Sequence, residues 1–598
     1  MKQLLIGIDV GSTTTKITVL NKTTESLLYS DYRRHHADQL ASVLFAIRYA
    51  DMAEDSFHQE LLAEGERILK QVTEENRYAV IPASRPYQND PLVNHNLPEM
   101  FTSLGIPVLT ADAVPGVNDV DLTNSRLDVV NNYHARMLGS AVIAAENPHL
   151  EYVQIVSFGC GHDAYLSDEI IRLMKQGSGK IPLVLKLDES EIQGPLRIRV
   201  RSFIETVRMQ REKHEEAPVH ALTDPYPVKY EKKDRKERIV LIPNTSHAFY
   251  RVMSAAMERQ GLRAEPLPIG RDEAIRLGKK YVHNDICFPA QIVIGEALAA
   301  LKSGKYDGKD VAIATGKYIG DCRLTHYSAL LRKALDDAGF SDVPILTNDD
   351  ADFHNLHPGF RLNLLSALRI AYALPMIDIL EELLRKIRPY ELTKGNADAA
   401  FEQAMDAVID GLSRHGVNGA KHGFEIIEAR MSDVIQKSYF YRDMQVREYH
   451  LHKPLQEKLW YRMADLFFDL AHDAADKIAS AHPLYDRPAV RLPELVKESD
   501  PIIHHTFDAG EGVLIPGEIL HHAAHGCRAF VILQPFGCLP NHVVGRGISK
   551  RLKELYPDVQ ILPLDYDPDV SFANIENRLQ MLIMNAREQE AEKNEATM

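Results

Sequence analysis

Apolar runs that end in a turn with a cysteine constrain the fold of this chain more than any other feature. Val531–His542 (VILQPFGCLPNH) reads as a buried strand that leads into Cys538. Two other stretches repeat the arrangement, Val153–Gly161 (VQIVSFGCG) and Val311–Arg323 (VAIATGKYIGDCR). In open parallel sheets, ligands bind at the carboxyl edge of the strands. The pattern therefore predicts parallel sheets whose cysteine-bearing loops line a common site.

Strands and helices alternate along much of the chain, as in parallel α/β domains. Short strands are predicted at Tyr78–Pro82, Ile106–Thr110, Pro182–Leu187 and Leu196–Val200, and a helix at Leu127–Ala145. We predict an α/β fold with several doubly wound parallel-sheet domains that meet at a cluster site, together with a helical insertion.

Five segments follow from shifts in pattern and from Pro483–Asp500, a proline-rich stretch that we interpret as a linker. The predicted segments are 1–55, a small β-hairpin unit; 56–215, an α/β domain with Cys160; 236–350, an α/β domain with Cys287 and Cys322; 360–481, a helical arm; and 500–598, a C-terminal α/β segment with Cys538.

Composition excludes several classes of protein. The 598 residues are 45% hydrophobic and 26% charged, as in ordinary globular proteins, and the net charge of −15 argues against a nucleic-acid-binding surface. No uncharged apolar run reaches the ~18 residues of a membrane span, and the N-terminus lacks a signal-peptide cleavage pattern. We therefore expect a cytoplasmic chain without nucleic-acid or membrane partners. Its five cysteines are expected to be reduced thiols, metal ligands, or both.

Four cysteines in separate loops do not match the paired spacing of zinc ribbons or the ferredoxin run. Cys160, Cys287, Cys322 and Cys538 could together supply the thiolates of one [4Fe–4S] cluster, although inert buried thiols are the alternative. Because Cys287 precedes an amphipathic helix, we expect a lowered thiol pKa there. Cys527 is predicted to be a buried structural thiol.

Glycines beside these cysteines would let the backbone approach a cluster and free N–H groups for hydrogen bonds to sulfur. The predicted backbone positions near the cluster are Gly159, Gly161, Gly320 and Gly537. The catalytic residues remain unassigned.

Other polar residues have two interpretations each. Arg85 could bind an anion such as a coenzyme A phosphate, or could form a structural ion pair. His542 could donate to a cluster or substrate, or could be a loop histidine with local partners. The remaining groups are interpreted as structural: a salt-bridged strand surface of Asp188, Glu189, Arg197, Arg199 and Arg201, and surface pairs without a partner at metal-ligand spacing, His35-His36, His504-His505 and His521-His522.

The N-terminal stretch Leu4–Leu20 (LLIGIDVGSTTTKITVL) reads as strand, turn and strand, with Asp9 suited to a Mg²⁺ site. It resembles the first phosphate motif of the actin, sugar-kinase and heat-shock ATPase superfamily. With YSDYRRHHAD after it, the stretch resembles the start of a 2-hydroxyacyl-CoA dehydratase activase. After Asp51 neither the second phosphate loop nor the adenosine loop is found. Residues 1–55 are therefore interpreted as a truncated actin-like ATPase hairpin, and we expect no ATP site in this chain.

Further motifs extend the resemblance over most of residues 56–350 and 500–585. SRPYQNDP, SFGCGHDA, LKLDESEIQGPLRIRVRS, NDICFPAQ, GDCRLTHY and QPFGCLPNH followed by LDYDP resemble, in order, the activase–dehydratase fusion proteins of the 2-hydroxyacyl-CoA dehydratase group. The chain departs from that pattern at His162, where the family commonly has proline, and at Asp321, where it has glycine. An acidic Asp321 facing a cluster would disfavour reduction.

The resemblance implies an iron–sulfur protein that receives low-potential electrons from a separate ATP-dependent activase, or from another low-potential donor. It would use them in the radical dehydration of a 2-hydroxyacyl-CoA, which makes an acyl-CoA the candidate substrate. A second hypothesis is an electron relay or reductase with a fully ligated [4Fe–4S] cluster and no dehydratase activity. A third is a metal-free assembly protein. In each case the helical arm could form an oligomer.

Overall fold

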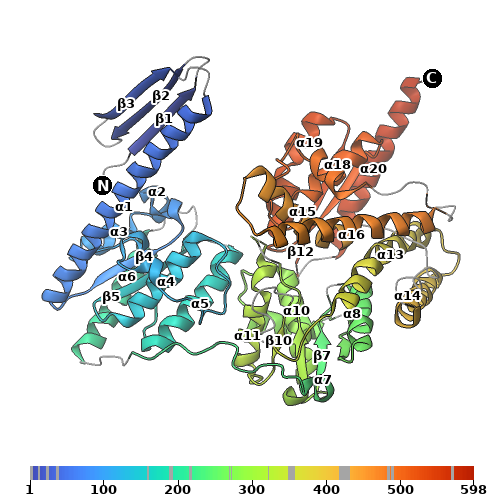
Figure 1. Cartoon of the computed structure of the whole chain (residues 1–598), viewed down its shortest axis with the longest axis horizontal. Coiled ribbons are helices and arrows are strands. Elements are labelled where there is room, and N and C mark those ends of the chain that lie inside the picture. The colour runs from blue at the N-terminus through green and yellow to red at the C-terminus, as the bar shows by residue number, and fades with distance from the viewer. Residues whose placement is uncertain are drawn as a thin grey trace. The chain divides into compact units, whose positions relative to one another are not determined.

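The computed structural model divides into two compact units, each described by itself (Figure 1). Unit 1 comprises residues 1–123, 131–158 and 169–222, and unit 2 comprises 124–130, 159–168 and 223–598. The structure describes all residues except 1–3, 11–13, 22–25, 35–38, 158–159, 188–192, 214–218, 245, 269, 271, 319, 321, 348–356, 416–430, 481–484, 486–489, 568–571 and 598. Within 1–51, 411–431 and 589–598 it describes only the backbone of the remaining residues, not their side chains.

Unit 1 begins with an antiparallel sheet in the order β1-β2-β3, formed by Leu4–Val10, Thr14–Asn21 and Ser26–Arg34. The predicted strand, turn and strand correspond to β1 and β2, and β3 adds a third strand. The long helix α1, Gln39–Glu74, follows and runs without a break through residue 55. The side chain of Asp9 lies outside the described residues.

A parallel sheet in the order β4-β5-β6 forms the centre of unit 1. Its core joins Val80, Val153 and Leu185 from the three strands to Leu196 and Val200 from a helix. The elements are β4 (Ala79–Ala83), the short helices α2 (Pro91–Asn94) and α3 (Leu97–Thr102), α4 (Asn132–Glu146), β5 (Leu150–Ser157), α5 (Gly161–Ser178, whose first residues count with unit 2), β6 (Leu183–Leu187) and α6 (Gln193–Glu212).

Two predicted strands of unit 1 are wrong. At 106–110 only a single bridge joins Val108 to Val80, and Pro107 has no N–H to continue a ladder. Leu196–Val200 lies inside α6, where buried Leu196 and Val200 are one helical turn apart. The alternating arginines Arg197, Arg199 and Arg201 are therefore exposed on a helix rather than on a strand. Asp188 and Glu189, predicted to pair with them, lie outside the described residues.

Unit 2 contains a parallel sheet in the order β10-β9-β7-β8. After β7 the chain forms β8 on one side of it, and β9 and β10 then follow on the other side. The strand order therefore reverses between β7 and β9. Ligands bind at such a topological switch point in parallel sheets. The elements are the short helix α7 (Asp234–Glu237), β7 (Ile239–Ile242), α8 (His247–Arg259), β8 (Arg263–Pro266), α9 (Asp272–Tyr281), α10 (Phe288–Lys302), β9 (Val311–Ala314), α11 (Tyr327–Asp337) and β10 (Ile345–Leu346).

The predicted helical stretch consists of α13 (Leu364–Ile387), α14 (Asn396–His415), α15 (Met431–Glu448) and α16 (Leu455–Ala479). Part of α13 packs on α8 through one core that contains Val252, Met376 and Ile377. The predicted linker contains another helix, α17 (Leu492–Glu498), whose Leu495 is buried in a cluster with Leu514.

The C-terminal part of unit 2 holds a parallel strand pair, β11 and β12. Cys527, which precedes β11, is exposed, so its prediction as a buried thiol is wrong. The elements are α18 (Leu514–Ala524), β11 (Ala529–Pro535), a π-helical turn (Pro540–Arg546), α19 (Ser549–Leu555), β12 (Gln560–Tyr566) and α20 (Phe572–Thr597).

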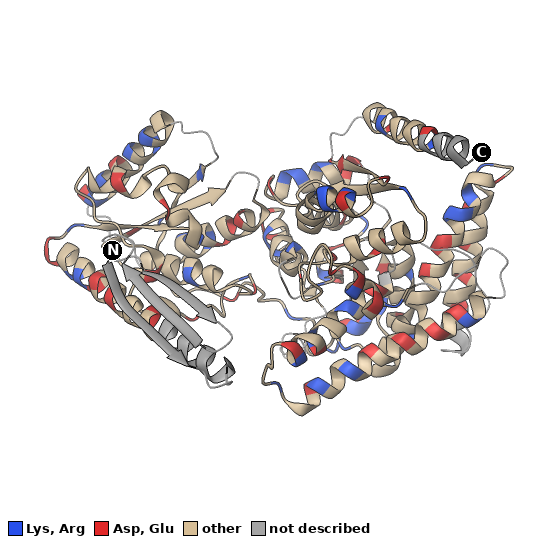
Figure 2. Cartoon of the chain, turned by 90° about the horizontal axis from the view of Figure 1, so that it is seen from above, with Lys and Arg blue, Asp and Glu red and all other residues tan. Residues whose placement is uncertain are grey.

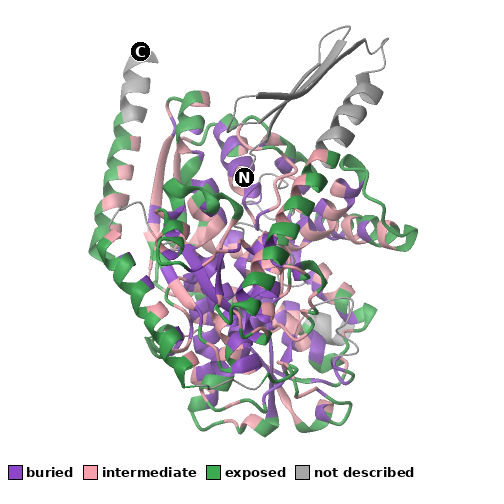
Figure 3. Ribbon diagram, turned by 90° about the vertical axis from the view of Figure 1, so that its left-hand side faces the viewer, coloured by how far each residue is buried: buried purple, intermediate pink, exposed green. Residues whose placement is uncertain are grey.

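The predicted α/β class is confirmed by the parallel sheets and the helices between their strands. Acidic and basic residues are interspersed along the helices (Figure 2), and the buried residues gather inside the folded parts while the outer helices are largely exposed (Figure 3). Among the described helices, none is long and apolar enough to cross a membrane.

Candidate metal centre

The loop after β11 is joined to the start of α10, and this junction brings two cysteines toward one another. Cys287 is the N-cap residue of α10, and the N–H of Phe288 donates to the carbonyl of Phe536 at 2.9 Å. Gly537 has φ +68°, and a Cβ atom there would lie 3.1 Å from the Cα of Cys287. Glycine is thus favoured by both the backbone conformation and the tight space. Cys538 follows it directly.

Cys322 enters the same region from the loop after β9. It is the N-cap residue of a short 3₁₀ turn, Arg323–His326. A Cβ atom placed on Gly510 would lie 3.7 Å from the Sγ atom of Cys322, so the loop before α18 packs on this thiol. Three loops of unit 2 that are far apart in the sequence therefore deliver Cys287, Cys322 and Cys538 to one place.

The three thiols share a buried environment and influence each other electrostatically. Burial, followed by the charge of Glu511 and then those of Cys287 and Cys538, raises the pKa of Cys322 to about 12. Burial and Glu511 raise the pKa of Cys538 to about 11. Burial also raises the pKa of Cys287, so the lowered value predicted from its helix N-terminus is wrong. Thiolates in this place require a compensating positive charge.

Two side chains contact the sulfur atoms directly. The hydroxyl of Tyr327 on α11 lies 3.1 Å from the Sγ atom of Cys287. The Nδ2 group of Asn541 donates to the Sγ atom of Cys538 at 3.1 Å and to Glu511 Oε1 at 3.4 Å. Hydrogen bonds of this kind tune sulfur ligands.

Arg323 is a buried cation beside these thiols. It directly follows Cys322, and its charge lowers the pKa of Cys287, opposing the larger effect of burial. Within the described part of the chain, its Nε and Nη1 atoms have no hydrogen-bond partner. Because buried guanidinium N–H groups without partners are unfavourable, this arrangement is suited to an anionic group among the thiols.

Cys160 is half-buried before α5 and belongs to unit 2 with the other three cysteines. A Cβ atom on its neighbour Gly161 would lie 2.2 Å from Arg323 Nε, so this segment packs against the residue that follows Cys322. His162, at the family departure, is 2.6 Å from the hydroxyl of Tyr165 through its Nδ1 atom.

Of the remaining predicted residues, Gly159, Gly320 and Asp321, the structure describes only Gly320. The carbonyl of Gly320 accepts a hydrogen bond from Thr325 Oγ1 at 2.8 Å, which closes the Cys322 loop. Gly159 and Asp321 lie outside the described residues.

The other polar residues considered in the sequence contact neighbours outside the group of three thiols or in their own loop. Arg85 lies in unit 1, with its guanidinium 5.7 Å from the ring centroid of Tyr133. His542 has its Nδ1 atom 3.0 Å from the carbonyl of Cys538 and its Nε2 atom 3.5 Å from Asp565. His504 and His505 lie with Asp500 at metal-ligand spacing, so the prediction that this pair has no such partner is wrong.

Sequence reasoning missed the polar residues around the thiols. Glu511, Tyr327 and Arg323 lie within or beside the glycine- and cysteine-containing stretches, but nothing in their spacing indicated contact with sulfur. Nearby, buried Lys437 places its Nζ atom 2.5 Å from Asp508 Oδ1, to which the hydroxyl of Tyr318 also donates at 2.6 Å. No sequence pattern connects this lysine of the helical stretch with the thiol loops.

Comparison with known families gives one match. Residues 8–114 match the family described as the CoA enzyme activase uncharacterised domain (DUF2229). The N-terminal part of the chain is activase-related. The match runs from β1 through the whole of α1 to residue 114, across the predicted boundary at 55, and it ends before the first cysteine. No curated protein and no solved structure matches the chain.

Proposed function

We propose that this activase-related chain is an iron–sulfur protein of the 2-hydroxyacyl-CoA dehydratase group. Cys287, Cys322 and Cys538 would hold the cluster, and Cys160 is the candidate for a fourth thiolate. The observation that carries the proposal is the convergence of three thiols from three loops beside Arg323, a buried cation whose Nε and Nη1 atoms have no hydrogen-bond partner among the described residues.

The charge and the hydrogen-bond donors around the thiols support the binding of a cluster. Thiolate-bound iron–sulfur clusters are anionic, so Arg323 would offset part of the buried negative charge. Tyr327 and Asn541 can donate hydrogen bonds to the sulfur atoms of Cys287 and Cys538. The close approach of Gly537 keeps side-chain bulk away from Cys287.

When bound, the cluster would supply low-potential one-electron chemistry to a 2-hydroxyacyl-CoA. Glu511 supports dehydration as the outcome because it lies beside the thiol site, where Asn541 contacts both it and Cys538, and because burial raises its carboxyl pKa. A carboxyl group with a raised pKa retains its proton more readily and can donate it to a departing hydroxyl group. Glu511 is therefore the proposed general acid.

An electron relay is the second candidate, and the segment that carries Cys160 supports it. Gly161 packs on Arg323, next to Cys322. A fourth thiolate from Cys160 would complete the ligation of the cluster and leave no ligand position for a substrate.

Metal analysis of anaerobically purified protein tests the cluster. We expect bound iron and sulfide, with visible absorbance that dithionite bleaches. Replacing Cys287, Cys322 or Cys538 by alanine should remove most of the iron. The exposed Cys527 offers a matched control, since Cys527→Ala should keep it. A wild-type protein that contains no iron after reconstitution, or that holds only zinc, would contradict the proposal.

Two further measurements separate dehydratase from relay. With a separate activase, ATP and a 2-hydroxyacyl-CoA, the dehydratase should form the enoyl-CoA, and Glu511→Gln should lower the rate while iron content stays constant. For the relay we expect no product, and Cys160→Ala should then reduce the iron content. In the dehydratase Cys160→Ala should leave the iron in place.

A further inference from the structure

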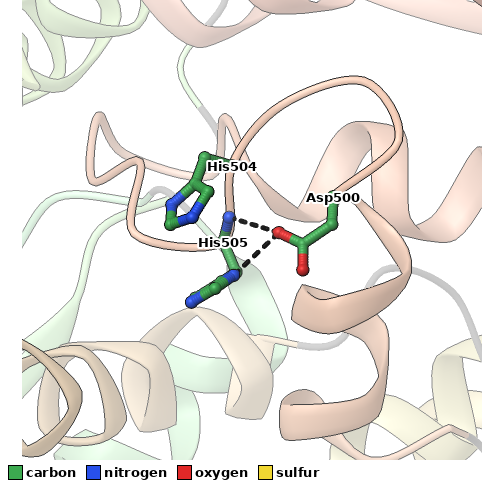
Figure 4. A group of neighbouring side chains, drawn as sticks. All are labelled: Asp500, His504 and His505. Atoms are coloured by element: carbon green, nitrogen blue, oxygen red, sulfur yellow. Dashed lines mark hydrogen bonds and ion pairs between the residues drawn. The ribbon is translucent and has the colours of Figure 1, made fainter. Parts of the chain in front are cut away.

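A second group of metal-ligating side chains lies outside the thiol site, in the segment between α17 and α18. Asp500, His504 and His505 offer one oxygen and two nitrogen atoms that all lie within 4.8 Å of one another. Figure 4 shows the two imidazole rings beside the Asp500 carboxylate, with the backbone N–H and the ring of His505 both directed at one carboxylate oxygen.

His505 is oriented by carboxylates on both sides of its ring. Its Nδ1 atom lies 2.7 Å from Asp500 Oδ1, and its Nε2 atom lies 3.0 and 3.1 Å from the two oxygens of Glu448 on α15. Metal-bound histidines typically donate their second ring N–H to a carboxylate, which fixes the tautomer. With Nε2–H directed at Glu448, the Nδ1 lone pair faces Asp500, and a cation between these two atoms satisfies both.

His504 supplies the third donor. Its ring stacks on that of His505 with centroids 4.1 Å apart and an interplanar angle of 30°. Asp500 and His504 are exposed and His505 is half-buried, so water has access to complete the coordination. Two imidazoles and one carboxylate form a donor set suited to Zn²⁺ and its neighbours in the first transition row.

We propose that Asp500, His504 and His505 bind a divalent transition-metal ion, with Glu448 orienting His505 from the other side. The site is separate from the thiol ligands. It also has a mechanical consequence, because the loop that leaves His505 carries Asp508, Gly510 and Glu511. A bound ion fixes the start of the loop that contacts Cys322.

Cobalt titration of the full-length, reduced protein tests the site. Co²⁺ is the probe because thiolate ligands give it intense charge-transfer absorption, whereas nitrogen and oxygen ligands give only weak visible bands. We expect one Co²⁺ ion bound without a thiolate band, in addition to any Co²⁺ held by cysteines. His505→Gln should abolish this weak-band site, and Glu448→Gln should weaken it about tenfold.

His521 provides the matched control, since its Nδ1 atom also lies 3.1 Å from a carboxylate, that of Glu498, but the described residues around it form no complete three-ligand group. His521→Gln should bind Co²⁺ as the wild type does. His504→Gln changes an exposed side chain. This variant should therefore lose the weak-band Co²⁺ site while its melting temperature, measured without metal, stays that of the wild type. Equal weak-band Co²⁺ binding by His504→Gln, His505→Gln and wild type would overturn the proposal, as would cobalt absorption of the thiolate type alone.

Discussion

The hydroxyl of Tyr327 lies 3.1 Å from the Sγ atom of Cys287, in a position where both groups are fully or almost fully buried. Burial and the neighbouring thiols raise the pKa of Tyr327 well above its ordinary value, so the phenol keeps its proton. It is therefore a permanent hydrogen-bond donor to sulfur when Cys287 is a thiolate.

Tyr327→Phe removes this donor and should lower the reduction potential of the proposed cluster, because hydrogen bonds to sulfur stabilise the more negative reduced state. A redox titration of the variant measures the shift. Tyr152→Phe is the matched control: it also removes a buried hydroxyl, which donates to the carbonyl of Met137 at 2.7 Å in unit 1. Both variants should lose about 1 kcal/mol of stability, but only Tyr327→Phe should change the potential. Equal potentials in all three proteins would contradict the assigned role.

The buried ion pair of Lys437 and Asp508 predicts an asymmetric response to mutation. The side chain of Lys437 is 2% exposed, whereas that of Asp508 is 25% exposed. Asp508→Ala leaves a buried ammonium group without its carboxylate and should lower the free energy of unfolding by about 3 kcal/mol. Lys437→Met leaves a carboxylate that water can reach, so its loss should be smaller.

Urea unfolding followed by the fluorescence of Trp460 measures this difference. Trp460 is the single tryptophan of the chain and lies in α16 of unit 2, the same unit as the ion pair. If Lys437→Met proves the more destabilising variant, the assigned asymmetry in desolvation is wrong.

Close helix packing beneath Cys287 depends on glycine. A Cβ atom on Gly295 of α10 would lie 1.8 Å from the carbonyl oxygen of Ala274 on α9. Gly295→Ala must push the two helices apart and should destabilise unit 2 by about 1–3 kcal/mol or more. Because α10 positions Cys287, the iron content of anaerobic protein should fall as well.

Gly547→Ala is the control for this prediction. Its backbone is α-helical, and no described atom lies within 4 Å of the added Cβ position. The control should keep both the melting temperature and the iron content of the wild type. A Gly295→Ala protein as stable as this control would disprove the packing constraint.

Stability should depend on pH through the buried histidine His357. Burial lowers its pKa from 6.5 to about 4, and its Nδ1 atom accepts the N–H of Tyr230 at 3.1 Å. Between these two values the unfolded chain binds a proton that the folded chain does not. Unfolding stability therefore rises with pH across this window and falls on acidification. The full contribution across this window is on the order of 3 kcal/mol.

Urea midpoints of Trp460 fluorescence from pH 4 to 6.5 test this dependence. His357→Gln should remove part of the slope, since glutamine does not titrate. A variant whose midpoint follows pH as steeply as the wild type would place the titration elsewhere.

The extent to which the sequence predicts this molecule differs between backbone and side chains. Buried apolar runs such as Ala79–Ala83 and Val311–Ala314 were recognisable because strand burial leaves a local pattern. Leu196–Val200 was misread because its apolar residues are spaced to fit both a strand and a helix over so short a range.

The cysteines of the thiol site were predictable from the sequence, and their surroundings were not. Cysteines at loop edges beside glycine or proline carry a local signal, so Cys287, Cys322 and Cys538 could be named in advance. Their electrostatics could not, because burial by other loops raises the pKa of Cys287 against the effect of its helix. Likewise, Lys437 and Asp508 meet only through tertiary packing.

The helical stretch of α13–α16 separates the loops of Cys287 and Cys322 from the loop of Cys538 in the sequence. During synthesis, Cys287 and Cys322 leave the ribosome long before Cys538 is translated. Early metal capture by two thiols alone would be incomplete and exposed to oxidation. Loading of the proposed centre must therefore wait until β11 has been translated and its loop has folded against α10.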